Sequence, residues 1–242
     1  MASALQDLFS VILAGESQTY NDHNWYVGNK LKGYIQGVST NRYSLLTKPL
    51  SEYTIGEVQK FQDHARDNVG QLWATGRYQI IPSTLDGLVT SLGLSKSDKY
   101  DQATQDKMGY QLLVERPAIK NYIQATNEDN KENLEKAALE VAKIWSSVGV
   151  PYATTGKYGR IEKNQSYYSG GGDRASEPTE KVQDSLRTLR QNRDNVFQDS
   201  KRGSSEKKNL TKTLFLVALI TVAGYVLLTE TKQGNKILAL LK

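Results

Sequence analysis

Glu16 lies where an apolar segment of the chain gives way to a polar one. Leu5, Leu8, Phe9, Ile12 and Leu13 recur at the spacing of one helix face, and the pattern stops at residues 14–15. A carboxyl group between an apolar helix and a concave polar lobe is partly desolvated, which raises its pKa toward the range of a general acid. The alternative is an exposed carboxylate at a helix C-terminus, where the helix dipole disfavours it. This segment alone leaves both interpretations open.

A second candidate is the turn that runs from Ala74 to Leu85. Its glycine, Gly76, lets the backbone approach a ligand closely, while Tyr78 and Gln79 could line a groove beside the turn. Pro82 suits the first turn of the helix that follows. Without further context, the same residues describe a tight turn before a helix.

A third candidate is the small-residue loop that follows an apolar helix at residues 144–152. Trp145 falls on the apolar stripe of that helix, so its spacing favours the core over a ligand platform. Tyr152 comes after the helix end and is the better candidate for stacking on a ligand or hydrogen bonding to it.

The composition limits the chemistry that these residues could do. The 242-residue chain has no cysteine and two histidines, so thiolate chemistry, a disulfide framework and a histidine-based metal site are not expected. We therefore expect no metal and no cofactor. The net charge is +5, but no dense basic patch interleaved with aromatic residues is seen in the globular part, so nucleic acid is not an expected partner.

Helices are predicted to position these residues around a small irregular or β lobe. Residues 17–50 are polar and rich in glycine and tyrosine, with short β-type runs at 25–27 and 33–35. A capping box at Thr54 and Glu57 opens a helix. Further helices are expected at 82–92, 102–115 and 117–123, and a central one at 131–148. The predicted fold class is mainly α, as an α+β domain over residues 1–160.

The composition changes after residue 160. Residues 169–173 are interpreted as a flexible hinge, and residues 161–209 as a polar, partly helical stalk. Val182, Leu186, Leu189 and Val196 have heptad-like spacing, which fits a solvated helix or a short, weak coiled coil. Residues 213–229 carry no charge over 17 positions, which predicts a transmembrane helix within a C-terminal anchor at 210–242.

The motifs together resemble a known family. Glu16-Ser17, followed some sixty residues later by Gly76-x-x-Gln79-x-x-Pro82-x-Thr84, is similar to phage muramidases and lytic transglycosylases of the lysozyme superfamily. The segments 53–59, 101–106 and 144–147 resemble corresponding stretches of phage wall-degrading domains, the last two those of the phage lambda endolysin group. The resemblance covers about residues 4–160 and implies a lysozyme-like fold that acts on peptidoglycan.

The resemblance implies a role for each candidate residue. Glu16 would be the general acid that protonates the glycosidic oxygen, and Ser17 would support Glu16 or the substrate. Tyr78 and Gln79 would line the sugar-binding groove, with Trp145 and Tyr152 as further substrate contacts.

The expected second carboxylate of a hydrolytic lysozyme is missing at its usual spacing, where Asn24 and Trp25 stand. Asp22 is the nearest candidate. The resemblance therefore favours non-hydrolytic cleavage between N-acetylmuramic acid and N-acetylglucosamine, which closes a 1,6-anhydro ring, over hydrolysis. A non-catalytic glycan-binding structural protein is the alternative from another class.

The membrane span bears on where the chain acts. Basic residues gather before the span, so the positive-inside rule would leave the large N-terminal part in the cytoplasm, where there is no peptidoglycan. No secretory signal peptide is recognised at the N-terminus. The simplest hypothesis is a phage protein in the virion or its internal membrane, or in the host cell membrane, that is used in host entry. Its expected partners are glycan strands, membrane lipid and other virion proteins. A bacterial enzyme tethered for wall remodelling is a second hypothesis.

Overall fold

The structure is a computed structural model that describes residues 3–17, 19–27, 30–35, 46–63, 71–126 and 129–193. These residues form one compact unit that extends from Ser3 to Arg193. In chain order its elements are α1 (Ser3–Glu16), β1 (His23–Val27), β2 (Lys30–Ile35), the 3-10 helix η1 (Leu50–Glu52), α2 (Ile55–Asp63), β3 (Gln71–Thr75), α3 (Pro82–Ser91), α4 (Gln102–Val114), α5 (Pro117–Gln124), α6 (Lys131–Ile144), β4 (Thr154–Gly156), β5 (Gly159–Ile161) and α7 (Thr179–Gln191).

The unit is mainly helical, as predicted, and the apolar face of α1 lies in its core. Leu8, Phe9 and Ile12 are fully buried, and the ring of Phe9 meets Tyr78 edge-on with centroids 4.9 Å apart. Burying side chains of this size stabilises the fold by about 2 kcal/mol each. The predicted C-terminal end of this helix is confirmed, and Glu16 is its last residue.

Local sequence signals explain where several other helices begin. Pro82 and Pro117 occupy the first turn of α3 and α5, where the missing N–H costs nothing. The side chain of Asn130 accepts a hydrogen bond from the backbone N–H of Asn133 and caps α6 as predicted. The helix ends at Ile144 rather than at residue 148, because the chain turns at Trp145 into an extended conformation.

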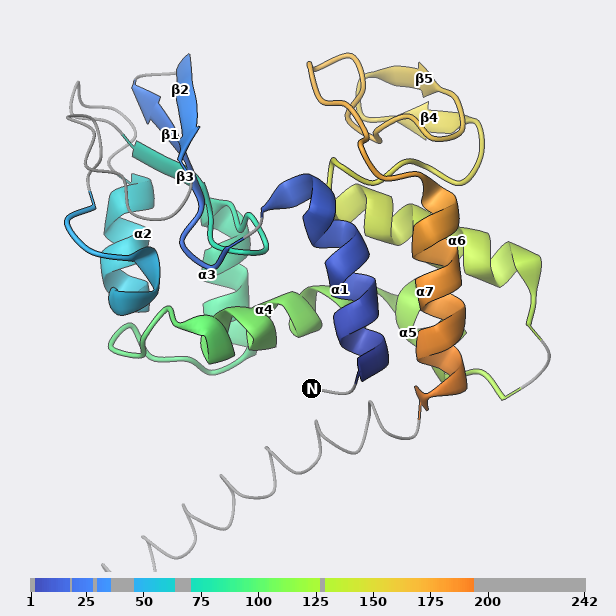
Figure 1. The fold of residues 1–242 in the computed structure, drawn as a ribbon, viewed down its shortest axis with the longest axis horizontal. Helices are drawn as coiled ribbons and strands as arrows, with labels where there is room; N and C mark the ends of the chain where they lie inside the picture. The colour runs from blue at the N-terminus through green and yellow to red at the C-terminus, as the bar shows by residue number, and fades with distance from the viewer. Residues whose placement is uncertain are drawn as a thin grey trace, which may run out of the picture. The chain divides into compact units, whose positions relative to one another are not determined.

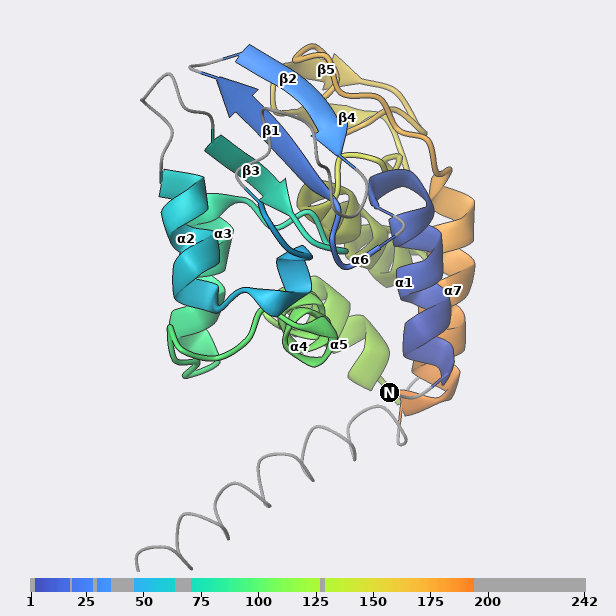
Figure 2. The same cartoon turned by 60° about the vertical axis from the view of Figure 1, so that its left-hand side comes forward.

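The predicted β lobe is a three-stranded antiparallel sheet with the order β2-β1-β3 (Figure 2). His23 lies opposite Ile35 on β2 and opposite Thr75 on β3, so β1 is the central strand. We call this sheet, together with residues 76–80 that follow it, the strand lobe. Gln62 on α2 attaches it to the helices, because its amide nitrogen donates to the carbonyl oxygens of Trp73 and Ile80 at 2.7 and 2.9 Å.

A second, smaller lobe was not predicted from the sequence. β4 and β5 form a two-stranded antiparallel hairpin, and residues 162–176 fold back over it. The backbone N–H of Lys157 donates to the carbonyl of Tyr167, and that of Val150 donates to Gln165. We call residues 150–176 the hairpin lobe. In the view of Figure 1 the two lobes lie on either side of the C-terminal end of α1.

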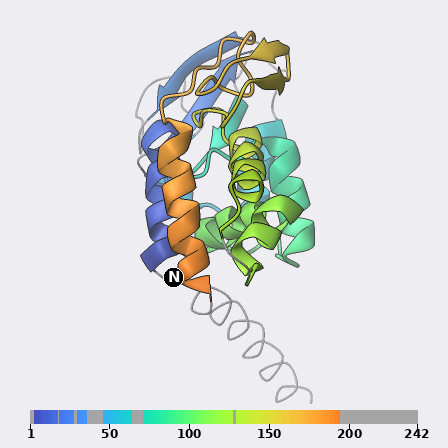
Figure 3. The same ribbon diagram turned by 90° about the vertical axis from the view of Figure 1, so that its right-hand side faces the viewer.

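Helix α7 belongs to the compact unit, which changes the predicted domain boundary at residue 160. Val182, Leu186 and Leu189 are buried, and α7 packs against α1, α5 and α6 (Figure 3). These three apolar residues therefore cover the core of this domain, and residues 161–193 are part of it rather than of a stalk, while Val196 lies outside the described residues. The predicted hinge at 169–173 is also part of the unit.

The remainder of the predicted stalk, at residues 194–209, and the predicted membrane span at 213–229 lie outside the described residues. Among the helices that the structure does describe, none is long and apolar enough to cross a bilayer.

Candidate functional site

Glu16 is held at the end of α1 by the loop that follows α6. The backbone N–H of Ser147 donates to the Glu16 carboxylate at 3.0 Å. The carbonyl of Ser147 accepts from the backbone N–H groups of Ser176 and Glu177, so the chain just before α7 fixes this loop. Gly15 makes the close packing feasible, because a Cβ there would lie 2.3 Å from the Ser176 hydroxyl and 2.6 Å from the Ser147 Cβ.

The environment of Glu16 favours the protonated carboxyl group. Burial raises the pKa of Glu16, and the hydroxyl and backbone N–H of Ser147 offset part of that rise because they stabilise the charged form. The negative charge of Asp173 raises this pKa further. The Ser147 hydroxyl is buried close enough to act on the Glu16 carboxyl group. Its orientation does not give a regular hydrogen bond to any residue that the structure describes. Glu16 as a whole residue is partly exposed.

Asp22, the candidate second carboxylate, is committed to its own turn. Its side chain is fully buried. Oδ1 accepts from the Thr19 hydroxyl at 2.6 Å, and Oδ2 accepts from the Thr19 backbone N–H at 3.1 Å and from the Ser17 hydroxyl at 2.9 Å. The hydrogen bonds of Asp22 with Ser17 and Thr19 therefore fix the segment that follows Glu16.

Asp22 also joins this segment to the turn that carries Gln79. The backbone N–H of Gly76 donates to the Asp22 carbonyl at 2.7 Å. Gly76 and Gln79 both have positive φ angles, 73° and 48°, which is unusual for a residue with a side chain. The Gln79 amide nitrogen donates to the Gly76 carbonyl at 2.9 Å, and its oxygen accepts from Asn24 at 3.1 Å. Gln79 is partly exposed and belongs to the strand lobe, whose turn is linked through Asp22 to the segment that follows Glu16.

Two residues of α4 clamp the same turn. The buried Gln105 accepts from the backbone N–H of Arg77 at 2.9 Å and donates to the carbonyls of Tyr20 and Tyr100 at 3.0 and 2.8 Å. Asp106 accepts from the hydroxyls of Tyr20 and Tyr78 at 2.8 and 2.7 Å. Both residues lie in the stretch 101–106, and no role was predicted for them.

The other aromatic candidates have different surroundings. Tyr78 and Trp145 are 1% and 2% exposed, and the Trp145 indole N–H donates to the Tyr78 carbonyl at 3.2 Å. A Cβ at Gly109 would collide with the Tyr78 ring at 2.5 Å, so the ring is tightly enclosed. Both residues therefore pack in the core beneath the turn, and together with Gln79 they line a cavity of about 350 Å³. Tyr152 is partly exposed near Lys136 on α6, and no contact joins it to Glu16 within the described residues.

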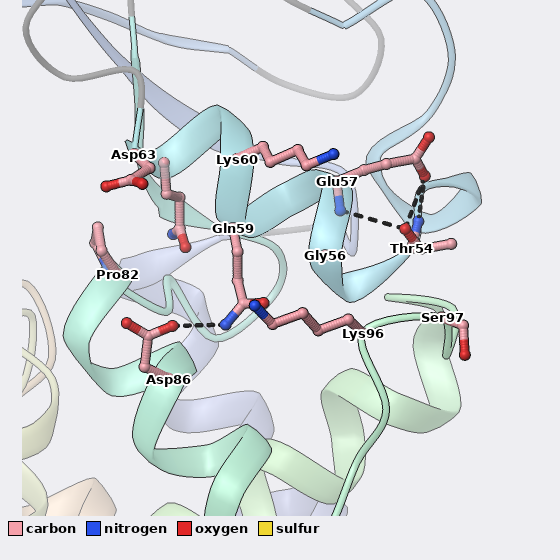
Figure 4. A pocket seen from close by; sticks show the side chains of 11 residues that line it. Thr54, Gly56, Glu57, Gln59, Lys60, Asp63, Pro82, Asp86, Lys96 and Ser97 are labelled. Atoms are coloured by element: carbon pink, nitrogen blue, oxygen red, sulfur yellow. Dashed lines mark hydrogen bonds between the residues drawn. The ribbon is translucent and has the colours of Figure 1, made fainter.

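A cavity of about 750 Å³ lies between α2, α3 and residues 96–97, away from Glu16 and Gln79 (Figure 4). Its wall shows the predicted capping box: the Glu57 carboxylate accepts from the backbone N–H of Thr54 at 2.7 Å, and the Glu57 N–H donates to the Thr54 hydroxyl at 3.2 Å. Gln59 donates to Asp86 across the cavity at 2.6 Å. Carboxylates and ammonium groups are mixed on its walls, and no residue of the predicted site lines it.

Sequence reasoning missed two residues near Glu16. Ser147 lies in the segment 144–147, for which no role was predicted, and Asp173 lies in the predicted hinge at 169–173. A carboxylate in a glycine-rich stretch gives no local signal of its distant partner. In the described part of the chain, no group of three or more His, Cys, Asp or Glu side chains is arranged to hold a metal ion.

The comparisons with known proteins add no family assignment: no protein-family model, no curated protein and no solved structure matches the chain.

Proposed function

We propose that this protein cleaves the glycan strands of peptidoglycan with Glu16 as its single acid and base. The observation that carries the proposal is the Glu16 carboxyl group itself. It lies at the end of a buried helix, its pKa is raised by burial, and the Ser147 N–H orients it. A carboxyl group with a raised pKa keeps its proton to higher pH than an ordinary glutamate, so it can donate that proton to a leaving glycosidic oxygen.

The proposed reaction is non-hydrolytic. Glu16 gives its proton to the oxygen between N-acetylmuramic acid and N-acetylglucosamine, and the C1–O bond breaks. The resulting carboxylate then takes the proton of the muramic 6-hydroxyl, whose oxygen bonds to C1 and closes the 1,6-anhydro ring. Glu16 ends the cycle protonated, and no water or metal is consumed. The engagement of Asp22 in its own turn supports this route over a lysozyme that uses Asp22.

Hydrolysis is the second candidate, because Asp173 acts electrostatically on Glu16. A carboxylate on the far side of the bond could activate a water. The products separate the two routes: anhydro-muropeptides indicate transglycosylation, whereas reducing ends indicate hydrolysis. Mass spectrometry of digested peptidoglycan is the measurement.

We further propose that the enzyme belongs to a virion and is anchored through residues 210–242 during host entry. The apolar, uncharged stretch at 213–229 supports the anchor. If purified virions lacked this polypeptide and showed no muralytic band in a zymogram, this part of the proposal would fail.

The first test is Glu16→Gln. The amide keeps the shape and can accept the Ser147 N–H, but it cannot donate a proton as an acid. We expect lysis to fall by at least about a hundredfold, the contribution of general acid catalysis. Glu132→Gln, at an exposed position on α6, is the matched control and should lyse like the parent protein. Lysis by Glu16→Gln at the parental rate would remove the enzyme proposal and leave a glycan-binding structural protein.

A further inference from the structure

The hairpin lobe holds a polar cavity of about 450 Å³ that neither the proposed acid nor its predicted partners use. Side chains with amide, hydroxyl and charged groups line it: Asn164, Gln165, Ser166, Ser169, Asp173 and Arg174. Such a mixture of donors and acceptors suits a ligand with many hydroxyl and amide groups, because each buried polar group on the ligand needs a partner.

The walls of this cavity are partly fixed and partly free. The Asn164 side chain accepts from the Thr179 N–H at 2.8 Å, and the Ser166 hydroxyl accepts from the Tyr168 N–H at 3.2 Å. Asp173 and Arg174 are exposed and make no hydrogen bond or ion pair with any residue that the structure describes. A ligand could engage both groups without breaking an existing contact.

Tyr158 supplies an aromatic surface against the same loop. Its side chain is 57% exposed, yet a Cβ at Gly170 or Gly171 would lie 3.1 or 2.6 Å from it, so glycine backbone supports the residue. The Lys157 ammonium lies 5.5 Å from the Tyr158 ring centroid and 5.3 Å from that of Tyr168. A supported and solvent-exposed tyrosine ring is suited to stacking on the C–H face of a sugar, and its hydroxyl can still hydrogen-bond.

The end of this loop touches the helix end that carries Glu16. Ala175 lines the cavity, and the next residue, Ser176, is the one whose hydroxyl leaves no room for a side chain at Gly15. Ser176 also donates its backbone N–H to the carbonyl of Ser147, which holds the Glu16 carboxylate. The cavity and the proposed acid therefore share one backbone support.

From these contacts we propose that the cavity lined by residues 164–175, bordered by Tyr158, binds a saccharide unit of the glycan strand near the bond that Glu16 acts on. Arg174 would pair with the carboxylate that the lactyl group or stem peptide of a muramic acid unit carries. The inference rests on the proposed function for its choice of glycan. The binding step itself needs no catalysis and can be measured separately.

The experiment measures binding to purified peptidoglycan by the full chain in detergent, in the Glu16→Gln background that prevents cleavage. Tyr158→Ala and Arg174→Gln should each weaken binding about tenfold, the worth of one stacking or charge-assisted contact. Tyr158→Trp should restore binding. Arg160→Gln is the matched control, because Arg160 is an exposed arginine on β5 of the same lobe but does not line the cavity.

A neutral oligomer of N-acetylglucosamine separates the two contacts. Tyr158→Ala should weaken binding of this oligomer as well as of peptidoglycan, whereas Arg174→Gln should weaken only the latter. Binding by both variants at the strength of the Arg160→Gln control would overturn the inference, and so would weakening by all three variants alike. Failure of the proposed function would give a different result. The unaltered protein would bind glycan, and this binding would depend on Tyr158 and Arg174, but the protein would not cleave the glycan.

Discussion

The two lobes beside the end of α1 differ in how firmly their residues are held. In the strand lobe, the turn at Gly76–Ile80 is tied to Asp22, Gln105 and Asn24, and even the Gln79 side chain is internally bonded. In the hairpin lobe, the charged groups of Asp173 and Arg174 make no hydrogen bond or ion pair with described residues. The strand-lobe side of the proposed site is thus pre-organised in the absence of a ligand. The hairpin-lobe side has charged groups that are available to bind one.

This contrast has an energetic consequence. Side chains that are already hydrogen-bonded lose their conformational entropy during folding. A rigid wall of such side chains therefore orients a substrate without a further loss of entropy on binding. Free charged side chains must be ordered when the ligand binds, which lowers the net gain of each contact. Substitutions in the strand lobe should therefore affect stability first, and those in the hairpin lobe should affect binding or pH dependence first.

The largest expected effect is on stability, when Gln105, which holds the strand-lobe turn, is replaced. Gln105→Ala leaves the Arg77 N–H and the carbonyls of Tyr20 and Tyr100 without their partner, so we expect a loss of about 3 kcal/mol in the free energy of unfolding. Denaturant unfolding of the full chain in detergent measures it. Gln102→Ala, at an exposed position at the start of the same helix, should change stability by less than about 0.5 kcal/mol. Equal stability of the two variants would show that the turn is not held by Gln105.

Asp22→Asn should have the next largest effect. The new NH2 group cannot accept the hydrogen bonds that the carboxylate takes from Ser17 and Thr19, so we expect a loss of about 2 kcal/mol. Below the unfolding transition, the cleavage rate of the folded protein should remain within about tenfold of the parent. Asp7→Asn, on an exposed position of α1, is the control. Complete loss of cleavage by stably folded Asp22→Asn would instead make Asp22 a catalytic carboxylate.

His23 should make the strand lobe sensitive to acid. Burial lowers its pKa below the ordinary value of 6.5; Nδ1 donates to the Asn21 carbonyl, and the buried Nε2 has no partner among the described residues. The unfolded chain therefore takes up a proton more readily than the folded one. Stability should be constant above about pH 6.5 and fall by up to about 1.4 kcal/mol per pH unit below it, until the lowered pKa is reached.

Unfolding curves at a series of pH values measure this slope. His23→Asn keeps an amide N–H near the position of Nδ1 but cannot titrate, so its slope should be smaller at every pH where His23 contributes. The same slope in parent and variant would assign the acid sensitivity to other groups.

The smallest effect is expected from Asp173→Asn in the hairpin lobe. The charge of Asp173 accounts for only a small part of the rise in the pKa of Glu16, so its removal should lower that pKa slightly. Cleavage that needs protonated Glu16 declines as the pH rises through this pKa, and the decline should move slightly to lower pH. A large fall in rate at all pH values, with reducing ends in the remaining product, would instead favour hydrolysis with Asp173 as the second carboxylate.

The sequence predicted the helices and the end of α1 because apolar periodicity, prolines and caps are local signals. It also predicted the position of Glu16 at that end. Its spacing also favoured a core position for Trp145, which is buried, but it could not reveal that Tyr78 faces inward, because an aromatic residue in a turn is compatible with both a groove and a core. Burial was decided by distant neighbours, Phe9 and Gly109 for Tyr78.

The hairpin lobe and α7 were missed for a related reason. Residues 169–173 have the composition of a linker, yet the glycines are there because Tyr158 packs against them. In α7, three apolar side chains in a mostly polar helix were too few to indicate a core helix. They are buried because α1 and α6 supply the rest of the apolar surface. The composition of α7 alone cannot show that other helices of the chain present an apolar surface against which it packs.

The antiparallel pairing of α1 and α7 places the two ends of the compact unit beside each other, at the opposite end of α1 from Glu16 (Figure 1). A chain that continues beyond Arg193 leaves the unit about 20 Å, the length of α7, from the carboxyl group. Any pull exerted through that connection would act on the base of the two helices and not on the reactive end. The same adjacency makes the unit suited to circular permutation, with Arg193 joined to Ser3 and new ends opened in an exposed turn.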